Sequence, residues 1–293
     1  MSQPLPVRYI RVTAVRRLTP HMIRVSFGAP DLADLGVDGP DRQVKLYFPR
    51  SGREAPRLPD PGTGNGDVMR WYAAYSAIPE NERPWMRSYT VRAHRPHEAA
   101  IDIDFVLHDD AGPATRWAAS AAPGDTLGMF GPSAYFAPRR PHADADWMLL
   151  AGDESALPAI GTLLEALPAG SRAVAYVEVP ERADEQSFDT PAEVTVHWLH
   201  RHRRSAPPAV HGELLIDAVR GAAFPDGPVR AWLAGEAGAV RAMRRHLVQE
   251  RGLAKPAVEF SGYWRARLSQ DDAPTEEDLA EARERLADAK PAP

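Results

Sequence analysis

Cysteine is absent from the 293-residue chain. This absence excludes disulfides, thiolate nucleophiles, zinc-cysteine clusters and iron-sulfur centres with cysteine ligands. Any redox chemistry must therefore use a bound organic cofactor or a metal held by histidine and carboxylate side chains.

A basic excess is also missing, because 35 Lys and Arg residues stand against 40 Asp and Glu residues and the net charge is −5. We therefore expect no nucleic acid partner, since such partners are bound through clustered positive charge. No apolar run of about 18 residues occurs, and the N-terminus lacks the apolar core of a signal peptide. The sequence thus predicts a cytoplasmic protein without a membrane partner.

The composition is that of an ordinary globular protein, with 44% hydrophobic and 26% charged residues. The length suits two domains of roughly 100 to 200 residues. Each half could bury its own core, so the chain is expected to fold without a partner, and a monomer is compatible with the sequence.

The N-terminal half shows short strands of alternating hydrophobicity with no long helix between them. Strands are expected at residues 7–15, 21–27, 44–48, 88–92 and 101–106. Such a series is typical of an antiparallel β-barrel. Residues 49–69 are rich in Pro and Gly without periodicity, and we interpret them as a mobile surface loop.

The pattern changes beyond residue 141. Continuous apolar runs that alternate with helices are typical of a buried parallel sheet. The runs lie at residues 147–151, 173–179, 194–199 and 230–234, with a helical stretch at 156–167. We therefore predict the fold class β + α/β, with an antiparallel β-barrel domain (residues 1–140), a Rossmann-like α/β domain (residues 141–270) and an acidic C-terminal helix or tail (residues 271–293).

A barrel followed by an α/β domain resembles the ferredoxin-reductase-like flavoproteins, in which one barrel strand carries Arg-x-Tyr-Ser/Thr. The tetrapeptide Arg87-Ser88-Tyr89-Thr90 fits this motif. A Tyr ring can stack on a flavin, a Thr hydroxyl can bond its polar edge, and an Arg supplies charge for the pyrophosphate. The tetrapeptide alone is a weak signal, because edge strands often carry Tyr and Thr for packing.

A second element follows at residues 108–118. Its Gly112-Pro113 is typical of a turn into a helix, and the unpaired N–H groups of the first helical turn attract phosphate. The alternative is a helix that only covers the barrel end. The two elements in this order favour a site for the pyrophosphate of FAD.

Two strand ends in the α/β half are candidates for contact with a nicotinamide cofactor. Gly152-Asp153-Glu154-Ser155 predicts a tight turn before a helix that Ser155 can cap, although Gly-x-Gly-x-x-Gly is absent. Glu236 lies at a similar strand end. The alternative for the first turn is that Ser155 is only an N-cap and that the acidic residues only favour the helix dipole.

Four segments carry a more specific resemblance. They lie at residues 87–92, 104–118, 151–160 and 262–265, and the Gly-Tyr-Trp-Arg of the last segment is the most distinctive piece. On these segments the chain is identified as a member of the siderophore-interacting protein family of FAD-dependent ferric-siderophore reductases. With residues 43–49 included, the resemblance covers nearly everything before the acidic tail.

The resemblance implies that the barrel binds FAD, that the α/β domain binds NADH or NADPH, and that the enzyme reduces a ferric siderophore so that imported siderophores release Fe(II). Lys45 and Arg265 are then candidates for binding the anionic siderophore. No protein nucleophile, acid-base pair or metal ion is required. The cofactor-binding residues that the resemblance implies are Arg87, Ser88, Tyr89, Thr90, Asp104, His108, Ala114, Thr115, Trp117, Ala118, Asp153, Ser155, Glu236, Tyr263 and Trp264.

The chain departs from the family pattern at one place. Gly131-Pro132-Ser133 stands where the family commonly has Gly-Pro-Arg, so a basic contact expected there is missing. Whether Arg139 or Arg140 replaces it is open.

Two other functions also stay open. A general NAD(P)H-dependent flavin or electron-transfer reductase would serve a protein acceptor. A non-enzymatic metal or siderophore carrier would draw on four histidines within a short stretch, although the arginines among them favour a solvated strand end or loop. These histidines are His197, His200, His202 and His211.

Overall fold

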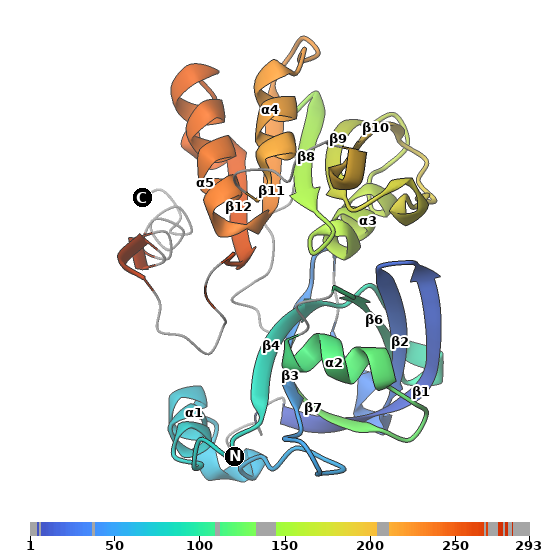
Figure 1. Ribbon diagram of the computed structural model, residues 1–293, viewed down its shortest axis with the longest axis vertical. Coiled ribbons are helices and arrows are strands. Elements are labelled where there is room, and N and C mark those ends of the chain that lie inside the picture. The colour runs from blue at the N-terminus through green and yellow to red at the C-terminus, as the bar shows by residue number, and fades with distance from the viewer. Residues whose placement is uncertain are drawn as a thin grey trace.

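The structure is a computed structural model. Two β-sheets, one from each half of the chain, lie one above the other (Figure 1). None of the described helices is long and apolar enough to cross a membrane. The described residues are 5, 7–36, 39–108, 112–132, 145–203, 211–266, 268, 275–277, 279–280 and 283.

Some of the sequence predictions fall outside the described residues. They include Ser133, Arg139, Arg140 and the expected domain boundary after residue 140. They also include most of the acidic C-terminal helix. Its described residues with helical structure are Glu276, Glu277, Leu279, Ala280 and Arg283.

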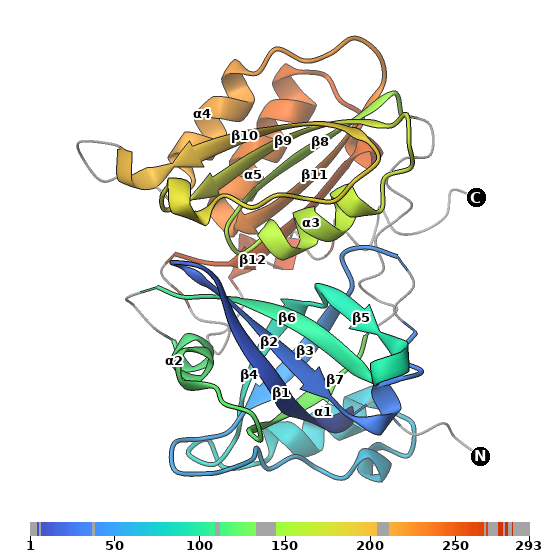
Figure 2. The ribbon, with the colours of Figure 1, turned by 90° about the vertical axis from the view of Figure 1, so that its right-hand side faces the viewer.

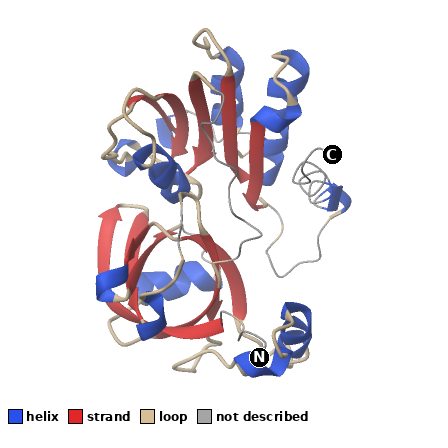
Figure 3. Ribbon diagram, turned by 180° about the vertical axis from the view of Figure 1, so that it is seen from behind, coloured by secondary structure: helices blue, strands red, loops and turns tan. Residues whose placement is uncertain are grey.

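The first sheet has seven antiparallel strands in the order β4-β3-β7-β1-β2-β6-β5. Its edge strand β4 also lies against β6, so the sheet curls into a barrel (Figure 3), and α2 lies across one end of it. The predicted antiparallel barrel is confirmed. The elements are β1 (Val7–Thr19), β2 (Met22–Gly28), β3 (Gln43–Phe48), α1 (Val68–Ser76), β4 (Trp85–Thr90), β5 (Ala93–Arg95), β6 (Ala100–Val106), α2 (Pro113–Ser120) and β7 (Thr126–Phe130).

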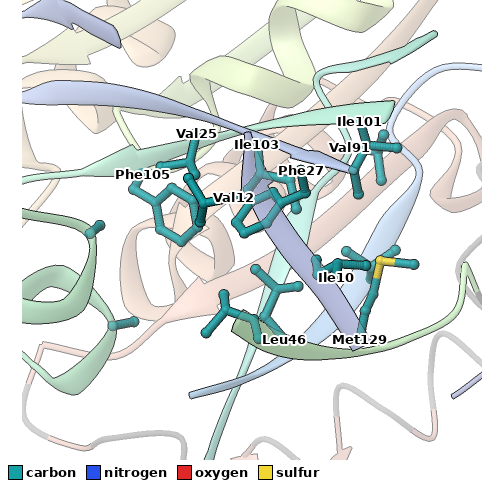
Figure 4. Close-up of a cluster of buried hydrophobic side chains, with 14 of the residues drawn as sticks. Ile10, Val12, Val25, Phe27, Leu46, Val91, Ile101, Ile103, Phe105 and Met129 are labelled. Atoms are coloured by element: carbon teal, nitrogen blue, oxygen red, sulfur yellow. The ribbon is translucent and has the colours of Figure 1, made fainter. Parts of the chain in front are cut away.

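Alternation along the strands separates the barrel interior from its outer wall. Phe27 of β2 and Phe105 of β6 point inward, whereas Arg24 and Asp104 of the same strands lie on the opposite face. Full burial of such an apolar side chain contributes about 1.5–3 kcal/mol, so a slip of one residue in register would be costly. Figure 4 shows this core, with Ile10, Val12, Val25, Phe27, Leu46, Val91, Ile101, Ile103, Phe105 and Met129 labelled.

The segment predicted as a loop is only partly irregular. Residues 49–60 have no regular structure, as expected, but a 3-10 helix (Pro61–Gly64) and then α1 follow. Trp71 of α1 is buried against Tyr47 of β3. The end of the segment is therefore anchored to the barrel by a helix that its Pro and Gly content did not predict.

The second sheet has five parallel strands in the order β10-β9-β8-β11-β12. Helix α3 covers one face of this sheet, and α4 and α5 cover the other (Figure 2). The predicted α/β half is confirmed. Its elements are β8 (Trp147–Asp153), α3 (Leu157–Glu165), β9 (Arg172–Val179), β10 (Glu193–His200), α4 (Glu213–Gly221), β11 (Val229–Glu236), α5 (Ala237–Arg245), a short π-helix (His246–Glu250) and β12 (Val258–Trp264).

The central strand β8 shows why its sequence is apolar throughout. Met148 and Leu150 pack with α3, whereas Trp147 and Leu149 pack with α4 and α5. A strand buried on both faces needs apolar residues at every position.

The two halves share packed contacts. Met22 of β2 lies in the same apolar cluster as the buried side chains of α3. Arg92, which follows β4, donates a hydrogen bond to Glu165 at the end of α3 (2.8 Å). On another side, Nδ1 of His21 lies 2.8 Å from the carboxylate of Asp184. These contacts fix the barrel against the α3 side of the second sheet.

Candidate cofactor and substrate site

Aromatic rings gather where α2 crosses the barrel. The ring centres of Tyr89 and Phe105 are 4.5 Å apart. The Trp117 ring of α2 lies 5.8 Å from Phe105 and 5.5 Å from Phe48. Burial raises the pKa of the Tyr89 hydroxyl, so the ring stays uncharged. Tyr89 and Trp117 were predicted from their motifs, whereas the two Phe residues were not, because their alternation along the strands indicates only barrel core.

The N-terminus of α2 suits an anion. The helix begins at Pro113, as predicted, and the residue before it bonds none of the first N–H groups through a side chain. Oγ1 of Thr115 lies 3.2 Å from Nε2 of His108 beside this helix end. Ala114 and Ala118 are buried against the barrel core and hold α2 close to it. Helix end, hydroxyl, imidazole and aromatic cluster together fit the pyrophosphate and ring system of FAD.

Asp104 lies away from this cluster. Nε of Arg24, on the neighbouring strand β2, donates to Oδ1 of Asp104 (2.6 Å), and a second guanidinium nitrogen donates to Oδ2 (2.8 Å). The structure therefore gives Asp104 a place in the barrel wall, and its role as a cofactor ligand stays a prediction.

The remaining residues of the flavin motif lie along β4. The Arg87 guanidinium donates to the carbonyl oxygen of Met86 (2.8 Å), and Ser88 is exposed. Thr90, the last residue of β4, is buried. The motif thus runs from the aromatic cluster to the junction between the two halves.

Asp153 joins the carboxyl ends of three strands. Strand order reverses between β8 and β11, and open α/β sheets bind ligands at such a point. Oδ2 of Asp153 accepts hydrogen bonds from the Glu236 N–H (2.9 Å) and the Trp264 indole (2.8 Å). Oδ1 accepts one from the Ser155 N–H (2.9 Å). Burial, together with repulsion from Glu154, raises the pKa of Asp153 to about 6.

The predicted helix cap at Ser155 is wrong. Ala156 precedes α3 and makes no side-chain cap, and the Ser155 hydroxyl donates to Asp153 instead. The reason is that a turn closed by the Ala156 N–H and the Asp153 carbonyl oxygen (2.9 Å) comes first, so the helix starts one residue later than predicted. Glu236 does cap a helix, because its Oε2 accepts a hydrogen bond from the Ala239 N–H of α5 (2.9 Å).

Tyr263 brings the two halves of the chain together. Its hydroxyl donates to Oδ1 of Asp41 (3.0 Å), just before β3. Gln43, which pairs with Thr90 across β3 and β4, donates to the Tyr263 oxygen (3.1 Å). The indole of Trp232 donates to Oδ2 of Asp41 (3.2 Å). The end of the flavin motif therefore lies beside the edge of the second sheet.

The two basic residues predicted for the siderophore lie on different sheets. Lys45 is on β3, where burial lowers its pKa, and within the described part of the chain no carboxylate pairs with it. Arg265 directly follows β12. Each half of the molecule contributes one of the two cations.

The four histidines of the alternative metal site have separate partners. Two of them contact aromatic rings of the α/β half. A third lies within hydrogen-bond distance of a carboxylate, and the fourth contacts a histidine ring of the barrel. A carrier site built from these histidines is therefore not supported by the geometry. The partners of His197, His200, His202 and His211 are Tyr176, Glu185, His21 and Trp264, respectively.

The chain matches two family models. Residues 11–136 match the siderophore-interacting FAD-binding domain, and residues 145–267 match the siderophore-interacting protein model. The first match confirms FAD as the predicted cofactor.

Several characterised and uncharacterised proteins resemble the chain along most of its length. An uncharacterized protein of Mycobacterium tuberculosis is 37% identical over 94% of this chain and 97% of its own. Ferric vibriobactin reductase ViuB of Vibrio cholerae is 31% identical over 86% of each chain. A ferric acinetobactin reductase of Acinetobacter baumannii is 29% identical over 69% of this chain and 70% of its own. These reductases bear out the predicted class of enzyme, an oxidoreductase.

Solved structures agree on the fold. A siderophore utilization protein from T. fusca superposes with a TM-score of 0.73 and 38% identity, over 93% of this chain and 97% of that one. A ferredoxin NADP+ reductase from Neisseria gonorrhoeae superposes with a TM-score of 0.57 and 13% identity, over 88% and 99% of the two chains. The predicted ferredoxin-reductase-like fold is confirmed.

Proposed function

Because the chain belongs to the siderophore-interacting protein family, we propose that it reduces Fe(III) held in a siderophore, with FAD as bound cofactor and NADH or NADPH as electron donor. The reaction would release Fe(II) from imported siderophores in the cytoplasm. The observation that carries the proposal is the junction at Tyr263, where Asp41 and Gln43, the strand partner of Thr90, bond the carboxyl edge of the second sheet. A flavin on the barrel and a dinucleotide on the sheet must approach each other there to exchange electrons.

The barrel would bind and orient the flavin. When bound, FAD supplies a carrier that takes two electrons at once and gives them up singly. Tyr89 and Trp117 offer aromatic faces for the ring system, and Thr90 offers a hydroxyl to its polar edge. The N-terminus of α2, with Thr115 and His108, would hold the pyrophosphate.

The second sheet would position the nicotinamide. Asp153 and Glu236 lie at the strand-order reversal, where such ligands bind. Both oxygens of Asp153 already accept hydrogen bonds, from Ser155 on one side and Trp264 on the other. We therefore assign Asp153 to holding the shape of this edge rather than to reacting.

Lys45 and Arg265 would orient the anionic ferric siderophore. Fe(II) is softer and less highly charged than Fe(III), so the hard oxygen ligands of catecholates and hydroxamates release it. The release itself needs no acid or base from the protein.

The proposal is tested with the purified protein loaded with FAD and kept free of oxygen. We expect the flavin absorbance to bleach with NADH or NADPH and to return when a ferric catecholate or hydroxamate siderophore is added. Return with a ferredoxin but not with any ferric siderophore would favour a protein acceptor. Failure to bind FAD would refute the proposal.

A second test concerns the two cations. Lys45→Ala and Arg265→Ala are each expected to raise the KM for ferric siderophore roughly tenfold, since hydrogen bonds to charged groups contribute about 1.5–3 kcal/mol. The rate of flavin bleaching by NADH should not change. Lys255→Ala removes the same charge from an exposed site before β12 and serves as the control. Unchanged KM values in both site variants would contradict the assignment.

A further inference from the structure

Three side chains that can ligate a metal ion lie where the turn between β1 and β2 meets the short helix after β9. His21 comes from the barrel, and Glu181 and Asp184 come from the α/β half. Each residue offers one ligand atom, and the three atoms all lie within 4.8 Å of one another. The sequence did not predict this group, because 163 positions separate His21 from Asp184. An imidazole nitrogen together with carboxylate oxygens suits a divalent transition metal.

Hydrogen bonds hold the Asp184 carboxylate in one orientation. Its Oδ1 accepts a hydrogen bond from the His21 N–H (3.0 Å), and its Oδ2 accepts one from the Glu181 N–H (3.3 Å). Outer hydrogen bonds of this kind orient the ligands of metal sites. Nδ1 of His21 lies 2.8 Å from the same Oδ2. When Nδ1 carries no proton, lone pairs of the two atoms face each other, and a cation between them relieves the repulsion.

The hydroxyl of Thr19 is an independent sign of a ligand at this place. Thr19 is 8% exposed, and among the residues that the structure describes its Oγ1 has no hydrogen-bond partner. Thr19 lines one small surface pocket together with His21, Asp184 and Glu154. Buried hydroxyls are normally bonded. An orphaned hydroxyl beside three metal-ligating side chains therefore points to a partner that the protein itself does not supply.

The charges around this pocket favour a cation. Glu154 on the pocket wall already has a positive partner, because the Arg201 guanidinium donates a hydrogen bond to it (2.7 Å). Within the described ranges, no Lys or Arg forms an ion pair with Glu181 or Asp184. Two carboxylates beside a neutral imidazole attract a doubly charged ion.

We propose that His21, Glu181 and Asp184 bind a divalent transition-metal ion of the Zn(II) type, with the Thr19 hydroxyl beside it. Ligand atoms lie about 2.0–2.2 Å from zinc, so two ligands of a tetrahedral ion are about 3.4 Å apart. The 2.8 Å contact between His21 and Asp184 widens by about half an ångström when the ion enters. Because the ligands come from both halves of the chain, the ion fixes the barrel to the α/β half. The inference does not rest on the proposed function.

The test is a calorimetric titration of ZnCl2 into the full chain, which carries no histidine tag and has been treated with EDTA and dialysed. We expect wild type to bind one Zn(II) per chain. His21→Ala and Glu181→Gln should each weaken binding at least about tenfold, since even changes around the ligands of a metal site cost about 10–100-fold. Zn(II) should also raise the melting temperature of wild type, because an ion that binds only the folded protein stabilises it. The rise should be smaller in both variants.

His197→Ala is the matched control for these variants. His197 is an exposed histidine that stacks on Tyr176 and lies outside the pocket. This variant should bind Zn(II) as wild type does, which separates the proposed site from unspecific binding to surface histidines.

Two outcomes would overturn the inference. Equal affinity in wild type, His21→Ala and Glu181→Gln would mean an adventitious ion only, and a wild type that does not bind Zn(II) one to one would refute the site directly. If one site variant does not fold, the other decides alone. The titration needs neither FAD nor a siderophore, so a protein that binds Zn(II) as expected but fails to bind FAD would refute the proposed function and support this inference.

Discussion

At the scale of a single residue, Gly235 shows how closely the carboxyl end of β11 is packed against Asp153. Its φ is +136°, and a Cβ atom there would lie 2.5 Å from Oδ2 of Asp153. Gly235→Ala is therefore expected to lower the free energy of unfolding by about 2–4 kcal/mol, through backbone strain and the clash with the buried carboxylate. Denaturant unfolding measures this loss.

A matched glycine serves as the control for this prediction. Gly221 ends α4, has no positive φ, and an added Cβ would meet nothing within 4 Å. Gly221→Ala should change the free energy of unfolding by less than about 1 kcal/mol, and in the stabilising direction. If both variants lose the same free energy of unfolding, the clash between the added Cβ atom and Asp153 does not destabilise the fold.

Residues at the junction of the two halves differ in how well the sequence predicts them. Asp153, Glu236 and Tyr263 were named because they lie in recognisable strand ends or in a family motif. Asp41 and Trp232 were missed, since neither belongs to a motif and 191 positions separate them in the chain. Only the docking of the two halves makes them partners.

At the scale of elements, the turn between β1 and β2 is bonded to a short helix that follows β9. Asp184 accepts hydrogen bonds from the N–H (3.0 Å) and the imidazole (2.8 Å) of His21. Burial would raise the pKa of Asp184, but the hydrogen bonds from His21 help to outweigh it, and the pKa lies below its ordinary value. A lowered pKa means that the stabilisation is present above the unfolded-state value and is lost as the pH falls through the folded-state value.

The prediction for this contact is a loss that depends on pH. Asp184→Asn should cost about 1–3 kcal/mol of unfolding free energy at pH 7, where the ionised carboxylate is bonded. The cost should shrink below about pH 4, because wild-type Asp184 then becomes protonated too. Urea unfolding of both proteins at several pH values measures it, and a cost that does not vary with pH would contradict the charged contact.

Elements differed in how well the sequence predicted them. Strands such as β2 and β6 were predicted because apolar and polar residues alternate along them, even though β6 is buried on both faces. The short strand β5 has three residues, too few to show a period. Helix α1 was hidden behind a Pro- and Gly-rich stretch, and its burial comes from contact with β3, a tertiary feature.

At the scale of the whole molecule, the junction of the two halves contains two carboxylates that oppose folding when ionised. The pKa of Asp41 and that of Asp153 are each raised to about 6 from an ordinary 3.8, chiefly by burial. A raised pKa means that the folded state binds the proton more tightly than the unfolded state. Each of the two groups therefore lowers the free energy of unfolding by about 3 kcal/mol as the pH rises from about 4 to about 6.

Asp41→Asn should remove its part of this dependence. Relative to wild type, the variant is expected to gain up to about 3 kcal/mol of unfolding free energy between about pH 4 and about pH 7, on top of any constant offset from the altered hydrogen bonds. Asp184→Asn should change with pH in the opposite sense, because its carboxylate stabilises the fold when ionised. If the Asp41→Asn difference is flat across this range, Asp41 ionises in the folded protein as it does in the unfolded chain, and folding does not raise its pKa. If it rises as expected, the molecule keeps a charge that destabilises the junction of its two halves, although Tyr263, Trp232 and Gln43 all donate hydrogen bonds to it.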